Sequence, residues 1–137
     1  MPAITKIEKI HSGKWLSIEK IFYTDLNEKK HCWESVSRIS RRGAVMIVAI
    51  TKPSNNIVLI RQFRPPARAH VIEFPAGLID EGESIEVTAK RELEEECGLK
   101  GRLVKITNPF YSSPGMSSES VAFAIIQIDE SNPDTFV

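Results

Sequence analysis

The sequence predicts an α/β fold in which a β-sheet lies between helical layers, with a small antiparallel sheet before it. Two runs of apolar, β-branched residues, 44–51 and 57–62, are typical of strands covered on both faces. Residues 85–97 repeat apolar side chains at i+4 and predict an amphipathic helix. Before residue 40, strand-like segments alternate with a turn, which predicts the small antiparallel sheet.

The N-terminal segments predict strands joined by a turn. Residues 3–10 place isoleucines three apart, which suits a helical turn or an irregular strand, and we favour the strand. Residues 14–23 predict a second strand, 24–29 a turn and 31–39 the returning strand. We expect residues 1–43 to form an N-terminal β-sheet subdomain.

Residues 44–137 are expected to form the main domain. The two apolar runs are separated by a turn at 52–56, and Pro65 with Pro66 ends the second. A short strand is predicted at 71–74. Ser84 is a candidate N-cap of the helix, and Gly98 can take the left-handed conformation that ends it. Later strands are predicted at 102–107 and 121–129, with a loop at 108–120 between them.

Composition excludes several classes of function. Net charge is zero, so no global field favours nucleic acid or an anionic membrane. No apolar run approaches the ~18 residues of a membrane span, and residues 1–10 lack the apolar centre of a signal peptide. Two cysteines form neither a zinc spacing nor a disulfide framework. These features favour a cytoplasmic protein with neither nucleic-acid nor membrane partners.

Acidic residues are unusually dense at 80–96, where eight carboxylates face only two basic residues, Lys90 and Arg91. Like charges three or four positions apart on a helix repel each other, so a helix needed only for folding would avoid them. A divalent cation among the carboxylates removes the repulsion. The alternative is a solvated acidic face with ordinary Lys90–Glu94 and Arg91–Glu95 pairs.

A helix brings three of these carboxylates together. Glu92 and Glu96 lie one turn apart, and Glu95 lies beside both. Such a set suits Mg²⁺ or Mn²⁺, hard cations that prefer oxygen ligands and also bind phosphate. Arg91 precedes Glu95 by four residues and can orient it, while Glu83 can turn back towards the cluster. Gly77 and Gly82 are expected to permit a tight turn in the preceding loop.

The pattern Gly77, five residues, Glu83, seven residues, Arg91-Glu92-Leu93-x-Glu95-Glu96-x-Gly98-Leu99 resembles the Nudix box at all nine constrained positions. This resemblance implies the Nudix fold, a mixed β-sheet in an α/β/α sandwich. It also implies Mg²⁺-dependent hydrolysis of a nucleoside diphosphate linked to another moiety. It implies that Glu92, Glu95 and Glu96 are metal ligands, with the carbonyl of Ala76 as a further one. Glu83 and Arg91 would support them.

The flanking segments resemble the ADP-ribose pyrophosphatase branch of that family over roughly residues 13–128. The resembling segments are 13–15, 33–36, 61–66, 73–77 and 113–119. The resemblance implies cleavage of ADP-ribose or a related nucleoside diphosphate sugar to AMP and ribose 5-phosphate. In that branch the N-terminal sheet is exchanged between subunits, so a homodimer is implied.

Five residues are candidates for substrate binding. Trp15 and Trp33 can stack on adenine, the alternative being packing within the N-terminal sheet. Arg38 and Arg64 can hold phosphate oxygens with the guanidinium fork, the alternative being surface ion pairs. Glu73 can bind ribose or support Arg64, the alternative being an exposed strand position.

One departure from the resemblance concerns the C-terminus. Members of the branch continue through a further strand, a loop carrying the glutamate proposed as general base, and a closing helix, so we expect this fold to lack them. Glu119 is the candidate base here, with a structural or substrate-contacting role as the alternative. A poorly covered sheet face is expected to favour association.

Two other functions stay open. One is a catalytically weak or idle Nudix module that binds ADP-ribose. The other is a Nudix hydrolase for another substrate, such as GDP-mannose or NADH.

Overall fold

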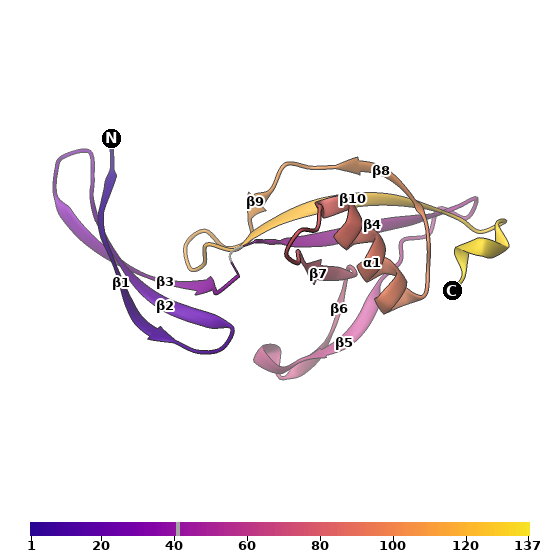
Figure 1. Cartoon of the computed structure of the whole chain (residues 1–137), viewed down its shortest axis with the longest axis horizontal. Coiled ribbons are helices and arrows are strands. Elements are labelled where there is room, and N and C mark those ends of the chain that lie inside the picture. The colour runs from indigo at the N-terminus through magenta and orange to yellow at the C-terminus, as the bar shows by residue number, and fades with distance from the viewer. Residues whose placement is uncertain (41) are drawn as a thin grey trace. The chain divides into compact units, whose positions relative to one another are not determined.

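The computed structural model describes residues 1–40 and 42–137 and divides the chain into two compact units. Unit 1 comprises Met1–Arg41 and Tyr111–Ser120, and unit 2 comprises Arg42–Phe110 and Val121–Val137. The elements, drawn in Figure 1, are β1 (Ala3–Ser12), β2 (Leu16–Thr24), β3 (Lys30–Arg38), β4 (Ala44–Lys52), β5 (Ile60–Arg64), the 3₁₀ turn η1 (Pro65–Ala67), β6 (Ala69–Glu73), β7 (Ala76–Leu78), α1 (Ile85–Cys97), β8 (Arg102–Ile106), β9 (Phe110–Tyr111), β10 (Ser120–Asp129) and the 3₁₀ turn η2 (Pro133–Thr135).

Unit 1 is built on the antiparallel sheet β1-β2-β3, as predicted for the N-terminus. Asp25 closes the turn between β2 and β3, because its Oδ1 accepts the backbone N–H groups of Asn27 at 2.8 Å and Lys29 at 3.0 Å. The distant segment 111–120 joins this sheet through a parallel bridge between Val36 and Ser117. The sheet edge of β3 is therefore partly paired by a loop.

Unit 2 contains a mixed sheet with the strand order β7-β4-β10-β8, and β9 pairs with β10. The central strands β4 and β10 are parallel, whereas β7 and β8 run antiparallel to their neighbours. In Figure 1, β4 and β10 run side by side through unit 2 with α1 next to them. The predicted mixed sheet and the predicted helix 85–97 are confirmed.

The hydrophobic core lies between α1 and one face of β4 and β10. On this face the side chains are fully buried, and Leu93 of α1 is only 1% exposed. The core residues are Val45, Ile47, Ala49, Ala89, Leu93, Ala124, Ile126 and Ile128. Because successive strand residues alternate in direction, the intervening residues such as Val48 and Ile125 occupy the opposite face, where they are half-buried.

The prediction for residues 57–62 was wrong in where the strand begins and in its surroundings. Val58 donates its backbone N–H to Ala49 at 3.0 Å, so the chain first folds back onto the end of β4. The strand β5 begins only at Ile60, and it pairs with β6 in a separate two-stranded sheet. It is therefore not a strand covered on both faces. The short strands β7 and β9 were not predicted.

Among the described residues, α1 is the one α-helix, so these residues place a single helical layer on the mixed sheet. The second helical layer of the expected sandwich is not formed by them. The described part of the chain contains no helix of the length and apolarity needed to cross a membrane.

Candidate metal and pyrophosphate site

Local capping positions the helix that carries the predicted acidic residues. Ser84 has extended backbone angles, and its Oγ accepts the N–H of Val87 at 3.2 Å, which satisfies one free donor of the first turn. Gly98 ends the helix at a φ of 64°, in the left-handed region, and donates its N–H to the Glu94 carbonyl at 2.9 Å. Both boundaries agree with the sequence prediction.

Glu83 lies just before the helix and is held from two sides. Arg91 binds it through Nε and Nη2, each at 3.0 Å, in a bidentate pair. The buried hydroxyl of Thr88 donates to it at 2.8 Å. These hydrogen bonds, first those from Arg91 and then that from Thr88, lower the pKa of Glu83 to about 2. Glu83 is therefore ionised at neutral pH.

The guanidinium of Arg91 also faces the helix carboxylates. Its Nη1 donates to Glu92 at 2.8 Å and to Glu95 at 3.1 Å. Hydrogen bonding to Glu83 is the main cause that raises the pKa of Arg91 above its usual range. The positive charge of Arg91 thus contacts three of the predicted acidic residues, and this attraction offsets the repulsion between their carboxylates.

Glu92 lies against the backbone of Gly77 in β7. Its side chain is 15% exposed, and a Cβ atom on Gly77 would lie 1.9 Å from Glu92 Oε1. Burial raises the pKa of Glu92, opposed by Arg91 and reinforced by repulsion from Glu96 and Glu95. Gly77 lies in a strand and does not need a positive φ, so the prediction that it serves a tight turn was wrong. It leaves room for the carboxylate.

Glu96 approaches the same strand. Its Oε2 accepts the backbone N–H of Ala76 at 3.0 Å, so the carboxylate lies beside the Ala76 peptide. Glu95 is exposed, at 59% for its side chain. The structure therefore brings Glu92 and Glu96 onto β7, and it leaves Glu95 at the surface beside Arg91.

The donor set at this site fits a hard divalent cation. Carboxylate oxygens of Glu92 and Glu96 lie together at β7, and oxygen ligands of this kind are those that Mg²⁺ and Mn²⁺ prefer. The glycine at position 77 leaves room for them. Within residues 1–40 and 42–137, however, no three His, Cys, Asp or Glu side chains converge as a metal cage. Arg91 is the cation that contacts Glu92 and Glu95 here.

Gly77→Ala is expected to displace Glu92, because the new methyl group would occupy the position of its carboxylate. We expect Mn²⁺ affinity to fall by about tenfold or more, while the helical circular dichroism stays unchanged because the Glu92 side chain can rotate away. Gly115→Ala is the matched control, since a Cβ there meets nothing within 4 Å. Equal Mn²⁺ affinities of the two variants, measured by calorimetry, would contradict the role given to Gly77.

Two predicted substrate residues of unit 2 contact each other. Arg64 on β5 donates to Glu73 on β6 at 2.8 Å, and Gln62 donates to the same Glu73 oxygen at 2.5 Å. The guanidinium of Arg64 is half-exposed, with the Glu73 carboxylate fixed beneath it. The contact is the one that a supporting role of Glu73 would use, and it is equally the surface ion pair given as the alternative for Arg64.

The remaining predicted residues belong to unit 1. Trp33 donates its indole N–H to the Gly115 carbonyl at 2.9 Å, and Trp15 is 69% exposed with Lys14 over its ring. Arg38 forms an ion pair with Glu119. Arg38, one of the two predicted phosphate-binding arginines, is therefore the partner of Glu119, the predicted base.

Sequence reasoning missed two supporting residues, Thr88 and Gln62. For Thr88 a local signal was available, because it is a polar residue four positions after the N-cap Ser84 and next to the apolar position Ala89. The pairing of β5 with β6, which brings Gln62 to Glu73, leaves no local signal because it joins separate strands.

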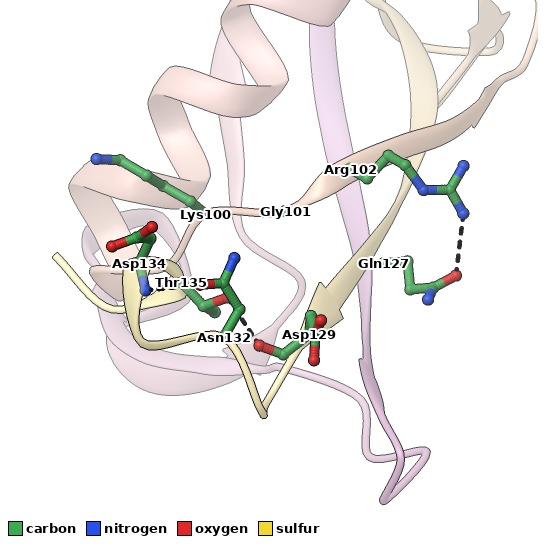
Figure 2. A pocket seen from close by; sticks show the side chains of 8 residues that line it. All are labelled: Lys100, Gly101, Arg102, Gln127, Asp129, Asn132, Asp134 and Thr135. Atoms are coloured by element: carbon green, nitrogen blue, oxygen red, sulfur yellow. Dashed lines mark hydrogen bonds between the residues drawn. The ribbon is translucent and has the colours of Figure 1, made fainter.

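A separate cavity of about 410 Å³ lies in unit 2, beyond the end of α1. Figure 2 shows basic Lys100 and Arg102 there together with acidic Asp129 and Asp134. Since the charges are mixed, the cavity has no clear preference for a diphosphate. It contains none of the predicted site residues.

Comparison with known proteins supplies independent findings. The family model described as the NUDIX domain matches residues 40–135. An ADP-sugar pyrophosphatase from Mus musculus is 38% identical over 84% of this chain and 56% of its own length. An ADP-ribose pyrophosphatase from Saccharomyces cerevisiae is 36% identical over 93% of this chain and 59% of its own length. The chain thus spans less than two thirds of these two relatives.

A solved structure is similar to this chain in fold. The crystal structure of an ADP compounds hydrolase superposes with a TM-score of 0.77 at 26% identity, covering 99% of this chain and 75% of that chain.

Proposed function

The chain belongs to the Nudix family, and from that membership we propose that it hydrolyses the pyrophosphate bond of ADP-ribose or a related nucleoside diphosphate sugar. The expected products from ADP-ribose are AMP and ribose 5-phosphate. The observation that carries the proposal is the arrangement around β7, where Glu92 contacts Gly77, Glu96 contacts the Ala76 N–H and Arg91 joins Glu83 to Glu92.

Glu92, Glu95, Glu96 and the Ala76 carbonyl are proposed to hold Mg²⁺, with Mn²⁺ as a substitute. When bound, the metal would supply charge neutralisation of the diphosphate and a more acidic water. Glu83 and Arg91 keep the helix carboxylates oriented through the bidentate pair and the Nη1 contacts. Arg64, half-exposed and anchored by Glu73, is proposed to bind a phosphate oxygen of the substrate.

Unit 1 is proposed to bind the nucleoside. Trp15 and Trp33 keep much of their ring surface exposed, as stacking on adenine requires. Arg38 is proposed to bind the substrate, and Glu119 to act as base. Because the two form an ion pair here, each must exchange its partner before it can do so.

A homodimer is proposed to form through residues 1–43. Apolar side chains of β1 are exposed, with Ile4 at 64% and Ile10 at 54%, and covering them with a second copy removes apolar surface from water. Light scattering on the full chain in dilute solution is expected to give the mass of a dimer. The mass of a monomer would contradict this assembly. A cytoplasmic location likewise stays a prediction.

The test of the function is a substrate panel of ADP-ribose, GDP-mannose and NADH with Mg²⁺. We expect ADP-ribose to be cleaved fastest, with AMP and ribose 5-phosphate identified by chromatography. Faster cleavage of GDP-mannose or NADH would reassign the substrate. Calorimetric binding of ADP-ribose without turnover of any compound would indicate a binding module in place of an enzyme.

A further inference from the structure

Arg91 makes two kinds of contact with opposite sides of its guanidinium. Nε and Nη2 bind the two oxygens of Glu83, each at 3.0 Å, whereas Nη1 is shared between Glu92 at 2.8 Å and Glu95 at 3.1 Å. Glu83 precedes the helix, while the other two carboxylates are among the proposed metal ligands. The arginine therefore links an anchor outside the metal ligands to the ligands themselves.

We propose that Arg91 is an internal counter-ion that competes with the divalent cation for Glu92 and Glu95, and that Glu83 limits this competition by anchoring the guanidinium. This inference rests on the proposed function, since it presumes a cation at these carboxylates. On this proposal, the metal affinity depends on how the contacts of Arg91 are divided between Glu83 and the two proposed ligands, Glu92 and Glu95. Arg91 and Glu83 act here as positioning residues.

The charges around Arg91 give the direction of each effect. Both cations are attracted to the same carboxylates, so removing the guanidinium charge frees them for the metal. Glu92 contributes most, because its side chain is 15% exposed and ion pairs weaken with exposure to water, whereas that of Glu95 is 59% exposed. Removing Glu83 has the opposite effect, because the released guanidinium keeps Glu92 and Glu95 as its close partners, with Asp80 farther away at 3.8 Å.

The experiment measures Mn²⁺ affinity of the substrate-free full chain by calorimetry and by the electron spin resonance signal of free Mn²⁺. The variants are Arg91→Gln, Glu83→Gln and the double variant. The neighbouring pair Lys90–Glu86, with 2.7 Å between Nζ and Oε1, supplies the matched controls Lys90→Gln and Glu86→Gln. Each control removes the same charge on the same helix without touching the three glutamates at the site.

We expect Arg91→Gln to tighten Mn²⁺ binding by about three- to fivefold, the size of a partly exposed ion pair. We expect Glu83→Gln to weaken binding by a similar factor. In the Arg91→Gln background, Glu83→Gln should change nothing beyond its control. Arg91→Lys keeps the charge but loses the bidentate anchor, so it should not tighten binding.

Several outcomes would overturn the inference. Weaker or unchanged binding in a folded Arg91→Gln variant, judged against Lys90→Gln, would do so. So would a weakening by Glu83→Gln that persists without Arg91, because Glu83 would then act on the metal directly. Should Arg91→Gln fail to fold, tighter binding in Arg91→Lys or unchanged binding in Glu83→Gln would decide against it. Absence of Mn²⁺ binding in the wild type would instead overturn the proposed metal site itself, and this inference with it.

Discussion

Replacing Glu96 by glutamine is expected to lower kcat/KM for ADP-ribose with Mg²⁺ by about 100-fold or more, the usual cost of removing one preorganised electrostatic contact from a reaction centre. The amide oxygen of glutamine can still accept the Ala76 N–H, which the carboxylate accepts at 3.0 Å. The backbone contact is therefore retained while the negative charge is lost. Steady-state kinetics with chromatographic detection of AMP measures the effect.

Glu94→Gln is the matched control for that substitution. Glu94 lies on the same helix, and its nearest basic partner is Lys100 at 3.6 Å, an exposed pair of little energetic consequence. We expect its kcat/KM to stay within about twofold of the wild type, as for an ordinary surface substitution. Equal activity of the two variants would rule out a metal-binding role for Glu96.

Replacing Leu93 by alanine is expected to lower the free energy of unfolding by about 2–5 kcal/mol, because it leaves a cavity in a closely packed core. Leu93 is 1% exposed and packs among Ile47, Ala124 and Ile126 between α1 and the sheet. A loss of this size is a large part of the roughly 5–15 kcal/mol that stabilises a typical domain. Urea denaturation followed by circular dichroism at the helix band measures it.

Val87→Ala provides the comparison, since Val87 is on the same helix but 51% exposed. We expect a change within about 0.5 kcal/mol, as is usual at the surface. Leu93→Ala should also weaken Mn²⁺ binding, because α1 carries Glu92 and Glu96. Similar stability losses in both variants would show that the helix does not depend on this packing.

Elements with local signals were predicted well. The helix was placed at its observed bounds because Ser84 and Gly98 supply capping interactions within a few residues of the helix ends. The hairpin between β2 and β3 has the same origin in the turn at Asp25. Strands that depend on distant partners were predicted less well. β7, three residues long, is defined by its pairing with β4. β5 pairs with β6 in a separate sheet and does not belong to the mixed sheet.

The site shows the same division. The Nudix pattern identified the candidate site residues within 77–99. Helical spacing alone placed Glu92, Glu95 and Glu96 near one another. Their different surroundings depend on contacts across the chain. Glu92 is covered because β7 lies beside α1, and the pairing of Arg38 with Glu119 joins residues 81 positions apart.

The sequence by itself determined the family, the helix that carries the glutamates and the set of carboxylates proposed to bind a metal. Only the tertiary structure decided that Gly77 leaves room for Glu92, that Glu96 accepts the Ala76 N–H, and that Arg91 is divided between Glu83 and the proposed ligands. The physical reason is the separation along the chain over which each interaction acts. Capping and helical spacing act within about one or two turns, whereas burial and ion-pair choice depend on which distant segments the fold places alongside.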